Sequence, residues 1–460
     1  MRAVKITLLG AGVLLGCGTD PRPHPDWTYS QVPSDPQRDG DAARGYDYLI
    51  NGGYITCGIP KTAYDQVFGN PPVADKIDGR TGDNKNLPFY YSAATSAEGV
   101  TVISANCLTC HASHLDNKVV VGLGSTDHDF TTDQAQYVDY GLNLVTDPAE
   151  RTEFQRFAGR VHAIGPYTKT LTVGVNPADN ITAVLMAHRD PATLAWSDTP
   201  LLDLPAVDQV VPVDVPPWWR MAKKSSMFYS AAGRGDHARI MMAASLLCTD
   251  TVEEAQRIDQ AFVDVRAWID TLSAPAWPYA IDRDLAAKGQ TVFAATCARC
   301  HGTYGDGGVY PNELVPLADV GTDPALVVGT TQFAAPFVSW FESSFWGQLS
   351  RLEPQMGYVA PPLDGIWATA PYFHNGSVPT LEGVLDSTKR PAVWQRTFDS
   401  SDYDQAAVGW NFVVAPGHAQ QADTHTYDTS EPGYGNAGHV FGDALSAVDR
   451  AAVLEYLKTL

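Results

Sequence analysis

The sequence has little cysteine, and most of what it has is concentrated in two places. Only seven cysteines occur in 460 residues. Four of them belong to the stretches CLTCH, residues 107–111, and CARCH, residues 297–301. The Cys and His frequencies of the chain predict roughly 0.003 chance occurrences of Cys-x-x-Cys-His. The repeated pattern therefore has a chemical meaning.

Positive charge is also scarce. The chain has 31 Lys and Arg residues against 52 Asp and Glu residues, a formal net charge of -21. This imbalance argues against nucleic acid and anionic membrane surfaces as partners. It would attract a basic partner, although an acidic surface that serves solubility alone explains the charge at least as well. The length and apolar content are those of a folded globular protein with two or three domains.

The first residues lack an apolar run long enough to span a bilayer. MRAVKITLLGAGVLLGC places two basic residues before a short apolar stretch, which predicts an export signal peptide over residues 1–16. Its ending, LLGC, resembles the lipobox of bacterial lipoproteins, in which cleavage exposes a cysteine that carries a lipid anchor. We therefore expect lipidation at Cys17 and a Pro-rich tether over residues 17–40, with an ordinary signal peptidase site as the alternative. The expected location is the periplasm or the outer membrane of a bacterium.

The chemistry that needs Cys-x-x-Cys-His is covalent haem attachment. The two cysteines form thioethers to the vinyl groups of one porphyrin, and the histidine then lies under the iron as its proximal ligand. A four-cysteine zinc site would want its cysteine pairs about 15 to 20 residues apart, and neither zinc nor a thioredoxin-like redox pair requires the histidine. The sequence thus predicts two covalently bound haem c groups, held by Cys107, Cys110 and His111 and by Cys297, Cys300 and His301.

Two further cysteines, Cys57 and Cys248, belong to neither motif nor to the lipobox. In an oxidising compartment they could form a disulfide. Two separate buried thiols are about equally compatible with the sequence.

The spacing of the motifs predicts two tandem cytochrome c-type haem domains, mainly α-helical, with extensive loops and few short strands. A helix is predicted from Asp250, because apolar residues recur at helical spacing until Pro275 ends it. A domain boundary follows, which gives an N-terminal haem domain over 41–280 and a C-terminal one over 281–460. Further helices are expected between residues 130 and 275.

Two amphipathic helices are predicted in the second domain. RDLAAKGQTVFAATCARCHG, residues 283–302, delivers the cysteines to the porphyrin, and SAVDRAAVLEYLKTL, residues 446–460, begins with a variant of the capping box at Ser446 and Asp449. Helices with such faces can cross against one edge of a haem, as in class I cytochromes c.

The ligand opposite His301 is open on spacing alone. The candidates are Met356, His374, His418, His425 and His439. The segment GYGNAGHVFG sets His439 between glycines, which let the backbone approach a porphyrin closely.

Several blocks of sequence carry a resemblance to a known family. APPLDGIWATAPYFHNGSVPTLEGVL, residues 360–385, resembles the signature of the di-haem cytochrome c peroxidase superfamily, and more closely its branch of haem-dependent rubber oxygenases. GNAGHVFG near the C-terminus and residues 213–242 are similar to the same branch. The resemblance implies that His439 is the distal ligand of the second haem, with Met356 as runner-up. It also implies that His374 lies near this haem without binding the iron.

The first haem has His111 beneath it and no persuasive partner above. His114 is too near in sequence to reach over the ring easily, while His128 lies in GLGSTDHDF, a loop that could approach the iron. In the peroxidase group a distal histidine follows the first motif at a comparable distance. The closer resemblance, to the oxygenase branch, implies a distal face left to dioxygen. We therefore expect an open or weakly ligated first haem, with ligation by His128 as the alternative.

The segment between the motifs contains two tryptophans and a set of basic residues. Trp218 and Trp219 are explained by core packing, but the resemblance implies an aromatic residue between the haems and so an electron path. The basic residues either neutralise haem propionates or form a solvated face; they are Arg220, Lys223, Lys224, Arg234 and Arg239.

These features predict an exported di-haem c-type cytochrome oxidoreductase. Peroxide or dioxygen would react at the N-terminal haem, while the C-terminal bis-histidine haem transfers electrons to it from a redox partner protein. The alternative is a non-catalytic electron-transfer protein with two six-coordinate irons. Calcium between the domains, known in such peroxidases, has no recognisable loop in this sequence. No residue motif identifies the substrate.

Overall fold

A computed structural model describes residues 29–69, 71–207, 209–419 and 423–460. Helix makes up about 39% of it, and the strands are short. The mainly α fold with extensive loops is therefore confirmed at this coarse level. The strands are only two to five residues long, and they form several separate small sheets.

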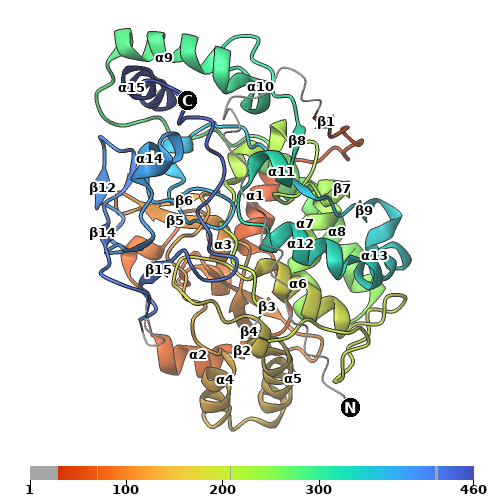
Figure 1. Ribbon diagram of the computed structural model, residues 1–460. Coiled ribbons are helices and arrows are strands. Elements are labelled where there is room, and N and C mark those ends of the chain that lie inside the picture. The colour runs from red at the N-terminus through yellow and green to blue at the C-terminus, as the bar shows by residue number, and fades with distance from the viewer. Residues whose placement is uncertain (1–28, 70, 208, 420–422) are drawn as a thin grey trace.

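The elements follow one another in a loop-rich order (Figure 1). The α-helices are α1 Ala42–Asn51, α2 Lys61–Phe68, α3 Leu108–His111, α4 Ala135–Leu142, α5 Pro148–Ile164, α6 Ala178–Ala187, α7 His237–Met241, α8 Val252–Ile269, α9 Arg283–Thr296, α10 Ala298–His301, α11 Leu317–Val320, α12 Ala325–Gln332, α13 Ala334–Ser343, α14 Leu381–Leu385 and α15 Ala447–Leu457. The strands are β1 Ser30–Gln31, β2 Ile59–Pro60, β3 Tyr91–Thr95, β4 Thr101–Ala105, β5 Ala112–Leu115, β6 Lys118–Val121, β7 Gly233–Gly235, β8 Glu313–Pro316, β9 Ser350–Leu352, β10 Gly357–Val359, β11 Val393–Gln395, β12 Tyr403–Asp404, β13 Gly409–Trp410, β14 Val413–Val414 and β15 Thr426–Asp428.

The helix predicted from Asp250 is α8. The Thr251 side chain caps it by accepting a hydrogen bond from the Glu254 backbone N–H. Its apolar stripe, including Ile258 and Phe262, is almost completely buried against the core that α8 shares with α7. The expected start of this helix and its inward face are confirmed, but α8 ends at Ile269, before Pro275.

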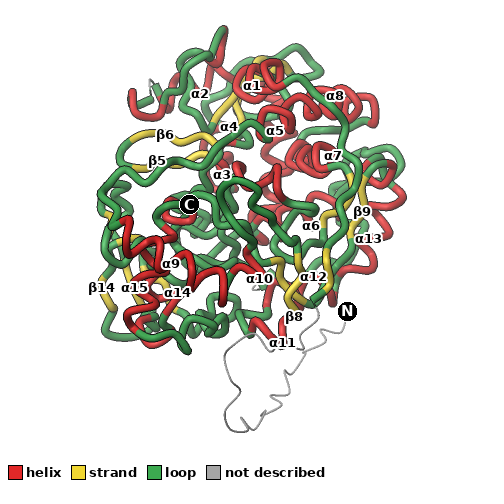
Figure 2. Tube along the Cα trace, turned by 90° about the horizontal axis from the view of Figure 1, so that it is seen from above, coloured by secondary structure: helices red, strands yellow, loops and turns green. Residues whose placement is uncertain are grey.

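The hydrophobic core around α8, here named the first core, also contains residues that follow the second motif in the sequence. Trp340, Phe341, Phe345 and Trp346, on and just after α13, are at most 5% exposed and pack in the same cluster as Phe262 of α8. Figure 2 shows α13 beside β9, on the side of the molecule that also carries α6 and α7. Residues from both sides of the predicted boundary at 280/281 thus pack in one core, so the two halves of the chain are interleaved. The division into two haem domains stays a prediction.

The two helices predicted in the second half are α9 and α15, which pack against each other at one end of the molecule (Figure 1). Ser446 caps α15 by accepting a hydrogen bond from the Asp449 N–H. The contact requires glycine at position 289, because a Cβ there would lie 1.8 Å from the Ala452 carbonyl oxygen. The close crossing places the C-terminal end of α9, and with it the second motif, beside α15.

The described part of the predicted tether is not free. Ser30 and Gln31 form β1, which pairs with β8, and Arg38 bonds to the carboxylates of Asp236 and Asp259. The tether predicted over residues 17–40 is therefore wrong for residues 29–40, because backbone pairing and ion pairs hold them on the body. The signal peptide and Cys17 lie outside the described residues. Within the described ranges, no helix combines the length and hydropathy needed to cross a bilayer.

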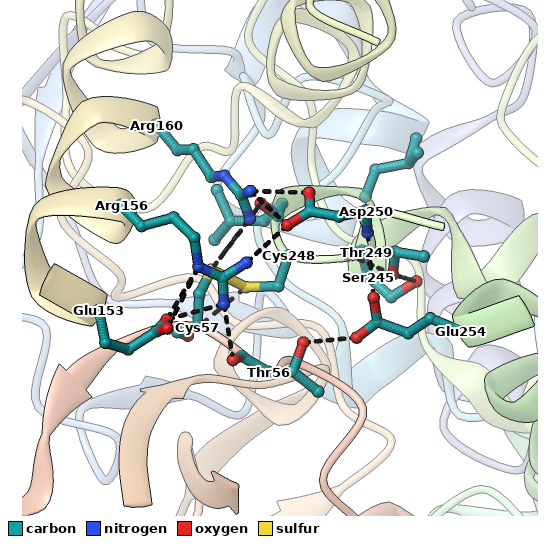
Figure 3. The surroundings of a disulfide bond; sticks show 12 residues. Thr56, Cys57, Glu153, Arg156, Arg160, Ser245, Cys248, Thr249, Asp250 and Glu254 are labelled. Atoms are coloured by element: carbon teal, nitrogen blue, oxygen red, sulfur yellow. Dashed lines mark hydrogen bonds and ion pairs between the residues drawn. A yellow bond between two sulfur atoms is a disulfide. The ribbon is translucent and has the colours of Figure 1, made fainter. Parts of the chain in front are cut away.

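Cys57 and Cys248 form a disulfide, which resolves the alternative that the sequence left open. Both residues are at most 1% exposed. Arginine and carboxylate side chains surround the bond, as Figure 3 shows for Arg156, Arg160 and Asp250. The bond joins the segment before β2 to the segment before α8.

Candidate haem sites

The first motif sits at the end of β4. Asn106 turns the chain there, because its side chain accepts a hydrogen bond from the Leu108 N–H at 2.8 Å and donates one to the Phe89 carbonyl at 3.0 Å. The single turn α3 follows, and His111 is its last residue. Asn176 donates a hydrogen bond to the Sγ of Cys110 at 3.0 Å. The predicted ligand residues therefore lie on one short, anchored turn.

The His111 ring stacks on Trp218, with ring centroids 4.7 Å apart and planes inclined by 20°. Burial lowers the pKa of His111 to about 4, against the opposing effect of the Pro216 carbonyl. The imidazole is therefore neutral at pH 7, which is the state that binds a metal. The stack on Trp218 fixes the plane of the His111 ring, and His111 lines a large cavity.

Cys107, Cys110 and His111 line a cavity of about 1800 Å³. This exceeds the roughly 300–1,000 Å³ of ordinary small-molecule and cofactor sites, so it has room for a porphyrin and a second molecule. His128 also lines the cavity, where its ring lies 4.5 Å from that of Phe130. Among the described residues, the recorded ring contact of His111 is with Trp218, and none joins it to His128. The residues present fit a haem at this position.

The second motif follows α9 directly and forms α10. The Nδ1 of His301 lies 2.8 Å from the Pro361 carbonyl oxygen, and because a carbonyl only accepts, Nδ1 carries the proton. This leaves Nε2 as the unprotonated ligand atom, the usual arrangement for a metal-binding histidine. Tyr304 reinforces the pairing, since its hydroxyl donates to the His301 carbonyl and accepts from the Leu363 N–H.

His439 lies opposite His301, with ring centroids 6.1 Å apart. Two imidazoles that bind opposite sides of one metal at about 2 Å have centroids roughly 6 Å apart. Burial, with His301 and Arg390 nearby, lowers the pKa of His439 to about 3, so this imidazole is also neutral. The spacing and protonation of the pair fit a haem iron between them, and the residues of the second motif fit a haem.

The other candidate ligands lie elsewhere. Met356 is 48% exposed, and His418 and His425 are exposed as well. His374 is buried between Tyr358 and Tyr229, and its Nε2 lies 3.1 Å from the Tyr358 hydroxyl.

Near the first motif, His114 also lines the cavity, and its Nε2 contacts Asp75 at 3.3 Å. Its position on β5, directly after the motif, explains why it cannot reach the opposite face.

Trp218 and Trp219 connect the two sites. Trp218 stacks on His111, while the Trp219 Nε1–H donates to the Asp364 carbonyl at 2.8 Å. Asp364 is three residues after Pro361, the acceptor for His301. The backbone of residues 361–364 therefore connects His301 of the second motif to Trp219. Its neighbour Trp218 stacks on His111 of the first motif.

The five basic residues of this segment divide into two groups. Arg239 pairs with Asp259 at 2.8 Å, Arg234 with Glu353 at 3.3 Å, and Lys223 with Asp364 at 2.7 Å. These three residues already have carboxylate partners.

Arg220 and Lys224 differ, because neither has a recorded carboxylate partner among the described residues and both line the 1800 Å³ cavity. Burial lowers the pKa of both, that of Lys224 to about 8. Cations that line a cavity without a paired carboxylate fit the propionates of a haem.

Sequence reasoning missed several residues of these sites. Pro361 and Arg390 act through a carbonyl and a buried guanidinium, and neither has a spacing signal. Asp214 lines the cavity wall, where burial raises its pKa to about 8 despite a hydrogen bond from Tyr229. The resemblance pointed to part of this set, because residues 360–385 contain Pro361 and residues 213–242 contain Asp214.

Residues 357–395, which hold Pro361 and Arg390, match the family described as RoxA-like, cytochrome c-like. Residues 286–335, which hold the second motif, match the family described as cytochrome c. The chain is related to the RoxA-like cytochromes c. The recognition made from sequence is confirmed, and the cytochrome c match implies covalently bound haem c.

Two curated relatives come from Sinorhizobium fredii (strain NBRC 101917 / NGR234). Uncharacterized protein y4iM is 29% identical over 291 residues, which are 54% of this chain and 64% of that protein. Uncharacterized protein y4iJ is 28% identical over 257 residues, 41% of either chain. The aligned regions thus span less than two thirds of both relatives.

Proposed function

We propose that the protein is an exported di-haem c-type cytochrome oxidoreductase. In this proposal Cys107, Cys110 and His111 would hold a haem that supplies reactivity towards peroxide or dioxygen, and Cys297, Cys300, His301 and His439 would hold a second haem that supplies electron transfer. One asymmetry supports it above all. His301 faces a second imidazole at 6.1 Å, whereas His111 faces a large cavity and has no recorded histidine contact in the described part of the chain.

The surroundings of the two sites suit these different tasks. An iron with one axial position free can bind a small oxidant, while two imidazoles fill both positions and restrict the second site to electron transfer. Arg220 and Lys224 hold the propionates of the first haem, and Trp218 keeps His111 in a fixed plane. The Pro361 carbonyl holds the proton of His301 at Nδ1. The His301 ring would therefore need no rearrangement to bind an iron or to stay bound when the iron changes oxidation state.

The cavity wall favours an apolar organic molecule as the second reactant. Ile181, Leu185 and Phe337 line it, and Tyr137 and Tyr140 lie at its rim with 61% and 67% of their surface exposed. Exposed aromatic side chains beside a cavity are typical of binding sites for apolar ligands.

Electrons pass between the sites through Trp218 and Trp219. The stack of Trp218 on His111 and the hydrogen bond from Trp219 to Asp364 support this path. Pro361 belongs to the same segment, lines the first cavity and binds His301. A basic redox partner, attracted by the net charge of -21, supplies the electrons.

Export is supported by the disulfide between Cys57 and Cys248. Disulfides form and persist in the periplasm and other oxidising compartments, and they are rare in the cytosol. Together with the signal peptide and the lipobox at Cys17, this favours a periplasmic or outer-membrane-anchored lipoprotein.

A second function is favoured by one observation, the position of His128. This residue is half-buried and lines the same cavity as His111. If it binds the first iron, both irons are six-coordinate, and the protein is a non-catalytic electron carrier.

Electron paramagnetic resonance and optical spectra of the oxidised, fully matured protein distinguish these functions. One high-spin and one low-spin haem, with a spectral change on adding peroxide or on adding O₂ to the reduced protein, support the oxidoreductase. Two low-spin haems without such reactivity support the carrier.

Substituting His128→Ala converts a low-spin first haem to high-spin only in the carrier. His114→Ala is the matched control, because His114 also follows the motif but contacts Asp75.

A further inference from the structure

Arg390 contacts the backbone on both sides of His439. Its Nη1 donates to the carbonyls of Asn436 at 2.8 Å and Gly438 at 2.7 Å, and its Nη2 donates to the His439 carbonyl at 3.1 Å. Its Nε donates to the Gly383 carbonyl of α14 at 2.8 Å. One guanidinium thus ties the loop 436–439 to a helix, using only backbone acceptors for these bonds.

The loop that Arg390 binds is strained. His439 has φ +46° and Gly438 has φ +74°, and a non-glycine residue adopts such a φ only when its surroundings hold it there. A Cβ on Gly438 would lie 2.1 Å from the backbone carbon of Gly321. The His439 N–H donates to the Val320 carbonyl at 2.6 Å. The loop is therefore pressed against residues 320–321 on one side and held by Arg390 on the other.

In the described part of the chain, no other residue is recorded with a hydrogen bond to the His439 ring. Its Nδ1 is buried and has no partner among the described residues, whereas His301 donates from Nδ1 to Pro361. Metal-binding histidines almost always use the second nitrogen in this way. Instead, the ring of Phe373 lies 5.8 Å from that of His439, and the Arg390 guanidinium lies 4.9 Å over Phe373. The loop and one aromatic neighbour of His439, Phe373, therefore depend on Arg390, while the ring of Phe441 lies 5.1 Å from that of His439.

We propose that Arg390 is a positioning residue for the distal ligand of the second haem: it holds His439 at axial distance by clamping the carbonyls of its loop, in place of the missing hydrogen bond to the imidazole. This inference rests on the proposed ligation by His439. It assigns Arg390 no contact with substrate and no part in the chemistry at the first haem.

The test uses matured protein carrying Arg390→Met, Arg390→Lys, His439→Ala and the control Arg450→Met. Arg450 also donates to backbone carbonyls close after the loop, including that of Leu445 at 2.9 Å, but has no recorded bond to residues 436–439. Spin state is read by electron paramagnetic resonance, and access to the iron is read by the rate and stoichiometry of carbon monoxide binding to the reduced protein.

Arg390→Met should convert the second haem to high-spin and raise the carbon monoxide binding rate at it by about tenfold or more, because charge-assisted hydrogen bonds are lost. Arg390→Lys should give an intermediate effect, because one ammonium cannot reach all these carbonyls. Added imidazole should restore the low-spin spectrum of Arg390→Met. In the double variant with His439→Ala, Arg390→Met should add no further change.

The outcomes distinguish a failure of ligation by His439 from a failure of the positioning role of Arg390. If His439→Ala leaves the second haem unchanged, ligation by His439 fails and the positioning role fails with it. If His439→Ala converts the haem but both Arg390 variants keep the low-spin spectrum and slow carbon monoxide binding, ligation stands and the role of Arg390 is refuted. An equal effect of Arg450→Met would show a general loosening of the fold and would also refute it.

Discussion

Replacing Asp250 by Asn should destabilise the protein strongly. Asp250 accepts from Arg160 Nη2 at 2.7 Å, Arg189 Nη1 at 2.8 Å and Arg156 Nη1 at 2.6 Å. The side chains of Arg160 and Arg189 are 3% and 0% exposed. The substitution leaves these two buried guanidinium groups without their carboxylate; Figure 3 shows Arg160 and Asp250 beside the disulfide.

The magnitude follows from the burial of the three groups. Removing one partner of a buried ion pair costs about 3–5 kcal/mol. The Asp250 side chain is 32% exposed, and Arg189 keeps hydrogen bonds to the Leu246 and Leu194 carbonyls. We therefore expect a loss of about 2–4 kcal/mol in the free energy of unfolding, measured by denaturant titration of circular dichroism.

Glu254→Gln is the matched control, because Glu254 accepts from the Thr56 hydroxyl and the Asp250 N–H without a recorded arginine ion pair. The amide oxygen of Gln can accept from the Asp250 N–H, and its NH₂ group can donate to the Thr56 hydroxyl, so we expect a loss of less than about 1 kcal/mol. Equal losses in Asp250→Asn and Glu254→Gln would refute the reasoning from buried arginines.

The pH dependence gives an independent check. Burial acts to raise the pKa of Asp250, but its ion pairs with Arg160 and Arg189 outweigh burial and hold the pKa below its ordinary value. A carboxyl with a lowered folded pKa stabilises the protein above its unfolded pKa of about 4, and this contribution is lost as pH falls through the folded value. The stability difference between the natural protein and Asp250→Asn should therefore shrink below about pH 4. A difference that stays constant with pH would contradict the assigned pairing.

Three further changes have definite expected outcomes. Replacing Cys57 and Cys248 by Ser should lower the free energy of unfolding by about 2–5 kcal/mol, because the disulfide spans 191 residues; denaturant titration with and without reductant measures it, and equal stability in both forms would contradict it. Gly438→Ala should lose the low-spin spectrum of the second haem, since the added Cβ displaces the loop from Gly321; an unchanged optical spectrum would contradict the close contact. Lys224→Met should lower the reduction potential of the first haem by about 60 mV, a tenfold change in the one-electron equilibrium constant, because a cation that stabilises the reduced form is lost. Spectroelectrochemistry measures the potential, and a shift confined to the second haem would refute the placement of Lys224 beside the first haem.

The helices and the motif residues could be predicted from the sequence because their signals are local. The apolar stripe of α8 and the cap at Thr251 depend on residues within one or two turns. The pairing of His301 with His439 spans many residues, and only the resemblance favoured it over Met356. The glycines beside His439 were a local sign of close backbone approach, and the contact of Gly438 with Gly321 is their physical reason.

The features that could not be predicted depend on contacts between distant segments. The sequence left the disulfide open because burial of Cys57 and Cys248 is set by the whole core. The packing of Trp340 and Trp346 into the first core had no signal, since an apolar residue does not specify its partner. Likewise, nothing in the sequence distinguished Arg220 and Lys224 from the ion-paired Arg239.

The interleaving of the two halves affects when each porphyrin can be attached. Cys107 packs at the edge of the core that Trp340, Phe341 and Trp346 complete, and these residues come after both Cys-x-x-Cys-His motifs. While the chain emerges from its N-terminus, the first site cannot close until the second motif has also emerged. We therefore expect the maturation machinery to meet both thiol pairs on an incompletely folded chain, with final compaction as the step that seals them.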